Sequence, residues 1–161
     1  MPEVVSHIWI VAYPVPGTPV NHWVALLQYS SGMVEVDMSV SSETSSLGTM
    51  GLLMLTKHDS TSMKNSAYQF SYAATNAPIG AIYDLLVTPD ANSRVLSKYR
   101  YSPEGNGCAY WVHNFVITLE KAGMVASKTA EDVWKRMQFY YEEGCALRDV
   151  TVQGQRFGTF L

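Results

Sequence analysis

The chain has 161 residues, of which 47% are hydrophobic and 16% charged, and its formal net charge is −3. This composition excludes an intrinsically disordered chain and supplies enough apolar side chains for one domain, residues 1–161, with a substantial core. The sequence has no basic stripe and no apolar run near ~20 residues, so it predicts neither a nucleic-acid partner nor a membrane span.

The cysteine content indicates the compartment. Cys108 and Cys145 are the only cysteines, too few for a disulfide framework, and no signal peptide precedes the first apolar segment. We therefore expect a reducing, cytoplasmic environment. The histidines and cysteines lack metal-ligand spacing, so no metal and no other cofactor is expected. The oligomeric state is left open, with a homodimer as one option.

The first half of the chain is typical of β-structure. Runs rich in β-branched and aromatic residues, bounded by Gly, Pro and Ser, predict strands over residues 4–12, 20–29, 33–40, 50–57 and 67–74. Ser30-Ser31-Gly32 predicts a hairpin turn. Residues 41–49 are polar, and we expect a loop there.

The second half favours helices. Pro78 suits the start of a short helix over 79–87, and Asn106 is a candidate cap for a helix that ends before Gly123. Thr129 and the acid three residues later approximate a capping box, which predicts a helix to about residue 143. Residues 150–160 form a closing strand or hairpin. Strands followed by helices indicate an α+β fold, an antiparallel sheet packed against a few helices.

Cys108 stands at the predicted start of the second helix. It follows a loop over 102–107 and precedes an apolar stripe at helical spacing: Trp111, Val112, Phe115, Val116 and Leu119. A thiol in the first turn of a helix faces unpaired N–H groups and the positive end of the dipole, which favour the nucleophilic thiolate. On spacing alone, a cysteine at the start of a helix is usually a small hydrophobic core residue.

His22, on the second predicted strand, could act as the base for such a thiol. A two-residue loop at Ser31-Gly32 would place Ser41 opposite His22, Ser39 diagonal to it on the same face, and Asp37 further along that face. The group that orients the imidazole is therefore Ser39, Asp37 or a backbone carbonyl. A packed histidine with no catalytic role is the alternative.

Aromatic residues concentrate near both candidates in sequence. They predict a binding site for a small, mainly apolar substrate, lined by Trp23, Tyr101, Tyr110 and Trp111. The same side chains could instead build the core.

Two segments carry a resemblance to known enzymes. His22-Trp23-Val24-Ala25-Leu26-Leu27 before a hairpin, and Gly107-Cys108-Ala109-Tyr110-Trp111-Val112, resemble the histidine strand and cysteine box of permuted papain-like thiol hydrolases. These are the NlpC/P60-related and lecithin:retinol acyltransferase-like proteins. The resemblance implies a papain-like fold with cysteine as nucleophile, histidine as base and a polar residue on the next strand. Gly107 stands where that family has asparagine, and Ala109 and Tyr110 replace a polar pair.

A second resemblance spans most of the chain. The stretches 99–112 and 119–123, the Asn21-His22-Trp23 box and the closing Gly158-Thr159-Phe160 are similar to a small fungal family of unknown function. This similarity implies no known activity, and it favours a role in secondary metabolism.

The leading hypothesis is a cysteine-dependent hydrolase or acyl-transfer enzyme that acts on a small, mainly apolar molecule. The alternatives are a non-covalent small-molecule cyclase, isomerase or binding protein on the same fold, and a non-catalytic interaction domain.

Overall fold

The computed structural model describes residues 3–17, 20–59, 65–103, 107–141, 151–152 and 158–161. The strands among these residues are β1 (His7–Pro14), β2 (Asn21–Tyr29), β3 (Gly32–Ser45), β4 (Gly48–His58), β5 (Tyr68–Ala73), β6 (Tyr99–Tyr101), β7 (Phe139–Tyr140), β8 (Thr151–Val152) and β9 (Thr159–Phe160). The helices are α1 (Ile79–Val87), α2 (Cys108–Lys121) and α3 (Thr129–Arg136).

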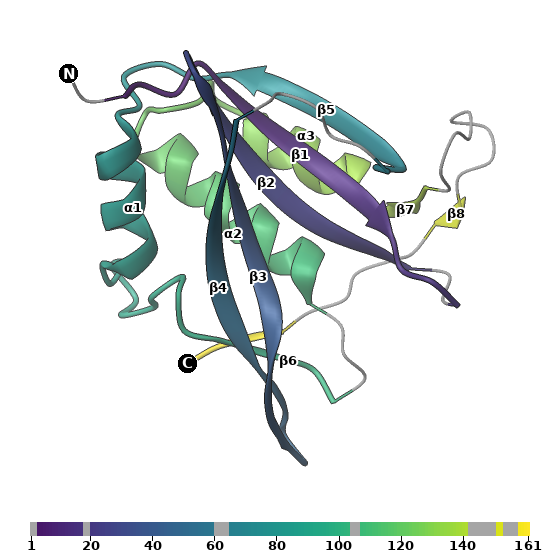
Figure 1. Ribbon diagram of the computed structural model, residues 1–161. Helices are drawn as coiled ribbons and strands as arrows, with labels where there is room; N and C mark the ends of the chain where they lie inside the picture. Colours follow the sequence, from purple (N-terminus) through teal and green to yellow (C-terminus); the bar gives the residue numbers. More distant parts are fainter. Residues whose placement is uncertain (1–2, 18–19, 60–64, 104–106, 142–150, 153–157) are drawn as a thin grey trace.

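The centre of the fold is an open antiparallel sheet of seven strands in the order β5-β1-β2-β3-β4-β6-β9. The three helices lie on one face of this sheet, and α2 crosses behind β2 and β3 (Figure 1). Strands β7 and β8 form a separate pair. The expected α+β class, with an antiparallel sheet packed against a few helices, is confirmed. No helix of the described residues combines the length and apolar character that crossing a bilayer requires.

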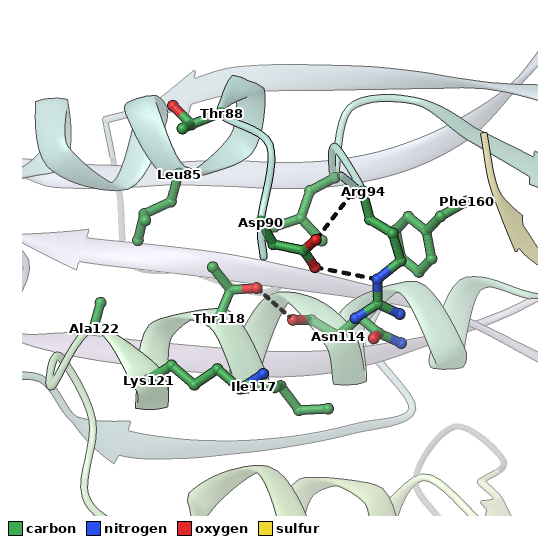
Figure 2. A pocket seen from close by; sticks show the side chains of 11 residues that line it. Leu85, Thr88, Asp90, Arg94, Asn114, Ile117, Thr118, Lys121, Ala122 and Phe160 are labelled. Atoms are coloured by element: carbon green, nitrogen blue, oxygen red, sulfur yellow. Dashed lines mark hydrogen bonds and ion pairs between the residues drawn. The ribbon is translucent and has the colours of Figure 1, made fainter. Parts of the chain in front are cut away.

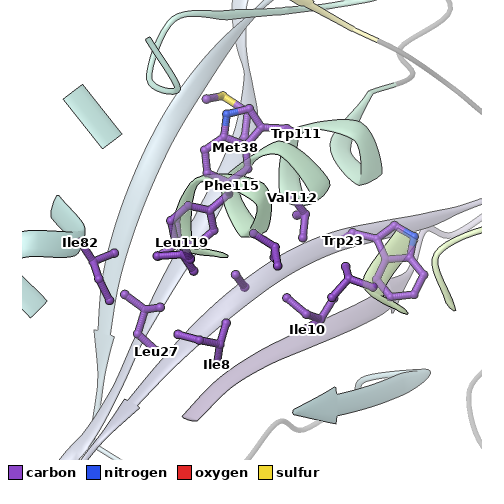
Figure 3. Close-up of a cluster of buried hydrophobic side chains, with 14 of the residues drawn as sticks. Ile8, Ile10, Trp23, Leu27, Met38, Ile82, Trp111, Val112, Phe115 and Leu119 are labelled. Carbon is purple, nitrogen blue, oxygen red and sulfur yellow. The ribbon is translucent and has the colours of Figure 1, made fainter. Parts of the chain in front are cut away.

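The core forms between α2 and the sheet because each presents apolar side chains on one face. In α2 these residues recur every three or four positions, and in the strands they recur every second position. Every second residue of β1 and β2 faces the helices, as Ile8 and Leu27 do. The buried apolar side chains of α2 pack against them (Figure 3). Trp111 has no exposed surface, stacks on Phe115 at 5.5 Å and donates its indole N–H to a backbone oxygen at 2.7 Å. This packing fixes the axial position and rotation of α2.

A second apolar cluster lies on the opposite face of the sheet. Val11, Val24, Leu26 and Met33 are buried there, with Trp9 and Tyr13 packed against them. Strands β1 and β2 therefore carry buried side chains on both faces of the sheet. This explains why the sequence of β2 is almost continuously apolar and does not alternate between apolar and polar residues.

The prediction of a loop over residues 41–49 is wrong. Strand β3 continues to Ser45, β4 begins at Gly48, and the two strands pair to the end of the hairpin with a register shift between Val40 and Thr44. The residues at this end of the hairpin are mostly exposed on both faces of the sheet. They therefore lack the alternation of apolar and polar residues that identifies a strand, and serine and threonine are compatible with such a strand.

The helix expected from Thr129 to about residue 143 is also shorter than predicted. Helix α3 ends at Arg136, and residues 142–143 lie outside the described part of the chain. A contact distant in sequence accounts for the difference: the side-chain amide of Asn21 donates to the carbonyl of Tyr141 at 2.8 Å and accepts from its N–H at 2.8 Å. These two hydrogen bonds to the backbone of Tyr141 hold the chain in an extended form.

The expected helix caps differ from the observed ones. The N-cap of α3 is Lys128, and the side chain of Glu120 accepts from the N–H of Ala130 at 3.0 Å, which replaces the predicted capping box. The N-cap of α2 is Gly107, and Asn106 lies outside the described residues. Helix α1 begins after Pro78 and spans 79–87 as expected.

Replacing Trp111 should test the core packing directly. Trp111→Ala removes a fully buried side chain and its hydrogen bond, so we expect the free energy of unfolding to fall by about 3–5 kcal/mol. Urea unfolding followed by circular dichroism measures it. Leu47→Ala, at a position 66% exposed, is the control and should change stability by less than about 0.5 kcal/mol. Similar small effects for both variants would contradict the packing described.

Candidate active site

The candidate site lies where β2 and β3 separate. The two strands pair from Tyr29 and Gly32 to Ala25 and Val36, and their paired register ends there. Just beyond the last pair, His22 Nε2 lies 2.6 Å from Asp37 Oδ1. This distance is short for a hydrogen bond between nitrogen and oxygen and is typical of one with a charged partner. Asp37 therefore fixes the orientation of the imidazole.

The observed register corrects the expected one. Tyr29 pairs with Gly32, so the hairpin loop is Ser30-Ser31 and each residue of β2 faces a β3 residue two places nearer the turn than predicted. A shift of two residues preserves the face of every side chain. It also brings Asp37 closer to His22 than the predicted pairing did, and it removes Ser41 from the position opposite the imidazole.

Ser39 does not orient the imidazole in the structure. It is half-buried on β3, opposite Leu52 of β4, and its hydroxyl makes no hydrogen bond within the described residues. Of the three orienting groups considered from sequence, the structure brings Asp37 to His22.

Cys108 is the first residue of α2, as expected, and its thiol is partly exposed. The sulfur lies 3.6 Å from the backbone oxygen of Asn21, to which the thiol donates. Cys108 is also close enough to His22, the residue next to Asn21, to contribute to the raised pKa of its imidazole. The structure therefore places Cys108 against the backbone of Asn21, next to the hydrogen-bonded pair of His22 and Asp37.

The environment of His22 favours the imidazolium. Burial of the ring opposes protonation, but the hydrogen bonds with Asp37 and then Cys108, together with the charges of both groups, raise the pKa of His22 from 6.5 to about 10. The side chains of His22 and Asp37 keep 31% and 19% of their surface exposed. Water and a small molecule can therefore reach the pair.

Two tyrosines of β6 hold the backbone on either side of the site. The hydroxyl of Tyr99 donates to the carbonyl of Gly107, next to Cys108, at 2.7 Å. The hydroxyl of Tyr101 donates to the carbonyl of Met38, next to Asp37. Burial, and then the charge of Cys108, raise the pKa of Tyr101, so it stays a neutral donor. Strand β6 thus ties the start of α2 to β3.

Glycine is required at the residue before Cys108. Gly107 has φ +142°, and a Cβ added there would lie 2.7 Å from the hydroxyl of Tyr99 and 3.0 Å from the backbone nitrogen of Gly158. The asparagine of the papain-like box could not occupy this position without moving both neighbours. The departure from that box is therefore matched by the local packing.

Three of the four aromatic residues expected to bind substrate are core residues. Trp23, Tyr101 and Trp111 have exposures of 4%, 3% and 0%. Trp23 packs edge-on against Phe70, and the polar atoms of Tyr101 and Trp111 bind backbone carbonyls. The hydrogen bonds of Tyr101 and Trp111 supply the partner that a buried polar group of an aromatic side chain requires. None of the three side chains lines an open site.

The fourth, Tyr110, is partly buried in the first turn of α2 and lies near Trp134 and Phe160. It is the one of the four with surface available for a ligand.

Asn21 is a structural residue of the site that the sequence interpretation did not single out. It is 7% exposed, its side chain binds Tyr141, and its carbonyl accepts from the thiol of Cys108. A polar residue at the start of an apolar strand was the available signal. Cys145 lies outside the described residues. Within the described residues, no group of three or more His, Cys, Asp or Glu side chains lies close enough to hold a metal ion.

A comparison with protein families matches residues 8–161 to a domain of unknown function, DUF7770. The chain belongs to this family. The resemblance to a family of unknown function is thereby confirmed, whereas fungal origin and a papain-like relationship stay predictions. No curated protein and no solved structure matches the chain.

The raised pKa of His22 predicts a pH-dependent stability for this DUF7770 chain. Because the folded state favours the imidazolium, the stabilisation is fully present below about pH 6.5 and is lost as the pH rises through about 10. In Asp37→Asn the largest partner is gone, so the fall in unfolding free energy across this window should be smaller than in the wild type. Urea unfolding at several pH values measures both slopes.

The matched control for Asp37→Asn is Glu35→Gln. Glu35 is on the same strand, and its Oε2 lies 3.6 Å from Nε2 of His58. The substitution therefore removes a carboxylate near a different histidine. Its pH dependence between about 6.5 and 10 should follow the wild type. Equal slopes in all three proteins would contradict a protonated, Asp37-bound His22.

The packing around Gly107 gives a second prediction. Gly107→Ala places a side chain at positive φ and against Tyr99, so we expect it to destabilise the protein by more than about 1 kcal/mol. Gly80→Ala, in α1 with nothing within 4 Å of the new Cβ, should stabilise by about 0.5–1 kcal/mol. Thermal unfolding compares the two. A neutral Gly107→Ala would mean that the start of α2 is not constrained as described.

Proposed function

We propose that the chain is a cysteine-dependent hydrolase or acyl-transfer enzyme that acts on a small, mainly apolar molecule. The observation that carries the proposal is the position of Cys108, at the start of α2 and bonded to the Asn21 carbonyl, beside the His22–Asp37 pair. A nucleophile within reach of a base, with the base oriented by a third group, is the arrangement that thiol catalysis requires.

In the first step, the Cys108 thiolate attacks the carbonyl carbon of an ester, thioester or amide. A carbon–sulfur bond forms and the carbonyl electron pair moves to oxygen, where N–H groups of the first turn of α2 stabilise the oxyanion. When the carbonyl re-forms, the bond to the leaving group breaks, and the His22 imidazolium donates its proton to that group. The products are an acyl-thioester and a neutral imidazole.

In the second step, the neutral imidazole takes a proton from water or an acceptor alcohol. Acylation has removed the charge of Cys108, which is one cause of the raised pKa of His22, while the hydrogen bond with Asp37 persists. The activated oxygen attacks the thioester, the carbon–sulfur bond breaks and the thiolate leaves. His22 ends protonated, so the starting ion pair is restored. Asp37 engages Nε2, which leaves Nδ1 for the proton transfers.

The same residues support a permuted papain-like arrangement as part of the proposal. The histidine strand β2 precedes the cysteine helix α2 in the chain, and the polar partner Asp37 comes from the next strand, β3. This is the order and distribution that the resemblance to NlpC/P60-related and lecithin:retinol acyltransferase-like proteins implies.

The surroundings favour a substrate with little charge. Tyr110, two residues after Cys108 in the first turn of α2, lies near the rings of Trp134 and Phe160, so this end of the helix carries a partly exposed aromatic surface. An apolar surface with a few placed polar groups suits an acyl chain or a small metabolite, and a role in secondary metabolism stays a prediction.

Alkylation of Cys108 tests the activated thiol. In a Cys145→Ser background, the label reports Cys108 alone. We expect iodoacetamide to modify Cys108 readily at about pH 6, where an ordinary thiol with a pKa near 8.5 is almost entirely protonated. His22→Ala should slow the reaction by about tenfold or more, and Asp37→Asn should slow it less. Glu35→Gln is the control and should react like the parent protein.

Turnover of an activated ester tests the covalent step. With p-nitrophenyl butyrate, we expect a burst of p-nitrophenolate and a mass increase of one butyryl group on Cys108. Cys108→Ala should show neither the burst nor the adduct. If Cys108→Ala keeps full turnover, the covalent mechanism is wrong and the non-covalent alternative replaces it.

A further inference from the structure

A groove along the second half of α2 shares none of its lining residues with the Cys108, His22 and Asp37 site. It has a volume of about 280 Å³ and lies between α2, the end of α1 and the segment that follows it, with Phe160 of β9 at one end (Figure 2). Along α2, its lining residues are Asn114, Ile117, Thr118, Lys121 and Ala122. These positions follow Cys108 by 6 to 14 residues, which is about 9–21 Å along the helix axis from the thiol.

The walls of the groove are apolar. Leu85 and Leu96 lie on one side and Ile117 on the other, and Phe160 adds an aromatic ring. Thr88 and Thr118 also line it, but their hydroxyls donate to helix carbonyls at 2.6 and 2.9 Å, so these donors are already used. The groove thus presents mainly hydrocarbon surface to an occupant.

One polar group of the groove is available for a further hydrogen bond. Asn114 is 6% exposed, and its amide nitrogen donates to the carbonyl of Tyr110 at 2.8 Å. The side-chain oxygen accepts no hydrogen bond from any described residue. This oxygen can therefore accept a hydrogen bond from a ligand N–H or O–H that takes the place of water.

The charges of the groove leave one cation unbalanced. Asp90 accepts from the side chain of Arg94 at 3.1 Å, and the guanidinium of Arg94 lies over the Phe160 ring at 5.5 Å, so this cation is neutralised. Lys121 has no ion-pair partner among the described residues. Long helical side chains point back toward the helix N-terminus, and Figure 2 shows Lys121 extending along the groove in this way.

We propose that this groove binds a small apolar carboxylate that carries one hydrogen-bond donor. The carboxylate would pair with Lys121, the donor would bind the side-chain oxygen of Asn114, and the hydrocarbon part would lie against Ile117 and Phe160. Lys121 and Asn114 are seven residues apart, about 10 Å along the helix axis. The Lys121 side chain extends toward Asn114 and shortens that span to the length of a small aromatic or aliphatic acid.

A titration with indole-3-acetate tests the proposal, because this probe has a carboxylate, one N–H and an apolar ring. Followed by nitrogen–proton NMR, binding should be saturable and should shift the side-chain amide of Asn114 and the backbone signals of Ile117 and Phe160. Indole-3-acetamide, without the charge, and 1-methylindole-3-acetate, without the donor, should each bind about three- to fivefold more weakly.

Two variants make the test specific. Lys121→Met removes the charge and keeps the hydrocarbon stem, so indole-3-acetate should bind about three- to fivefold more weakly, and its advantage over the acetamide should vanish. Lys128→Met, an exposed lysine outside the groove, is the matched control and should bind like the wild type. Ile117→Trp should fill the groove and abolish binding.

The opposite outcomes are equally clear. No saturable shift at these residues, or shifts that persist in Ile117→Trp, would overturn the groove as a binding site. Equal affinity for the acid and the acetamide in the wild type would overturn the carboxylate specificity. Cys108→Ser should leave binding unchanged, so the groove proposal can fail or succeed independently of the thiol mechanism.

Discussion

The packing of α2 against the sheet determines where every group of the candidate site lies. Trp111 and Phe115 are fully buried between the helix and the strands, so α2 can neither rotate nor slide without opening the core. This constraint places the first residue of the helix, Cys108, at the point where β2 and β3 separate. The chemistry of the site therefore depends on apolar contacts that begin one turn away from the thiol.

Strand β6 adds a polar constraint to this apolar one. Its two buried tyrosines bind the carbonyls of Gly107 and Met38, and these residues are the direct neighbours of Cys108 and Asp37. Removing either hydroxyl would leave a buried carbonyl unsatisfied, which is more costly than the hydrogen bond itself is favourable. The two sides of the site are thereby held at a fixed separation by a strand of only three residues.

Periodicity in the sequence was sufficient to predict the elements that pack locally. The apolar stripe of α2 predicts its start at Cys108 and the burial of Trp111, and the position of Pro78 predicts α1. The contact between His22 and Asp37 was not predicted in detail, because it depends on which two residues form the hairpin loop, and Ser30-Ser31-Gly32 allows more than one choice.

Contacts between residues far apart in the chain account for the remaining differences. The end of α3 depends on Asn21, which precedes Tyr141 by 120 residues, and no local pattern contains that information. Likewise, aromatic residues near a candidate site in sequence do not reveal whether they line a surface or fill a core. Trp23 and Trp111 are core residues because the strand and helix periods turn them inward.

The pairing of His22 with Asp37 bears on whether the site is a packing feature or a reactive one. A packed cysteine needs only apolar neighbours, yet Cys108 lies beside a half-buried imidazole whose pKa is raised by the hydrogen bond with Asp37. Burial of the ring opposes its charge, and half-buried ion pairs contribute little net stability compared with apolar side chains of similar size. The fold would therefore lose little if this pair were replaced by hydrocarbon. A protonated imidazole next to a thiol at a helix N-terminus does, however, stabilise a thiolate. This arrangement is the one that the proposed thiol chemistry requires, whereas packing alone does not require it.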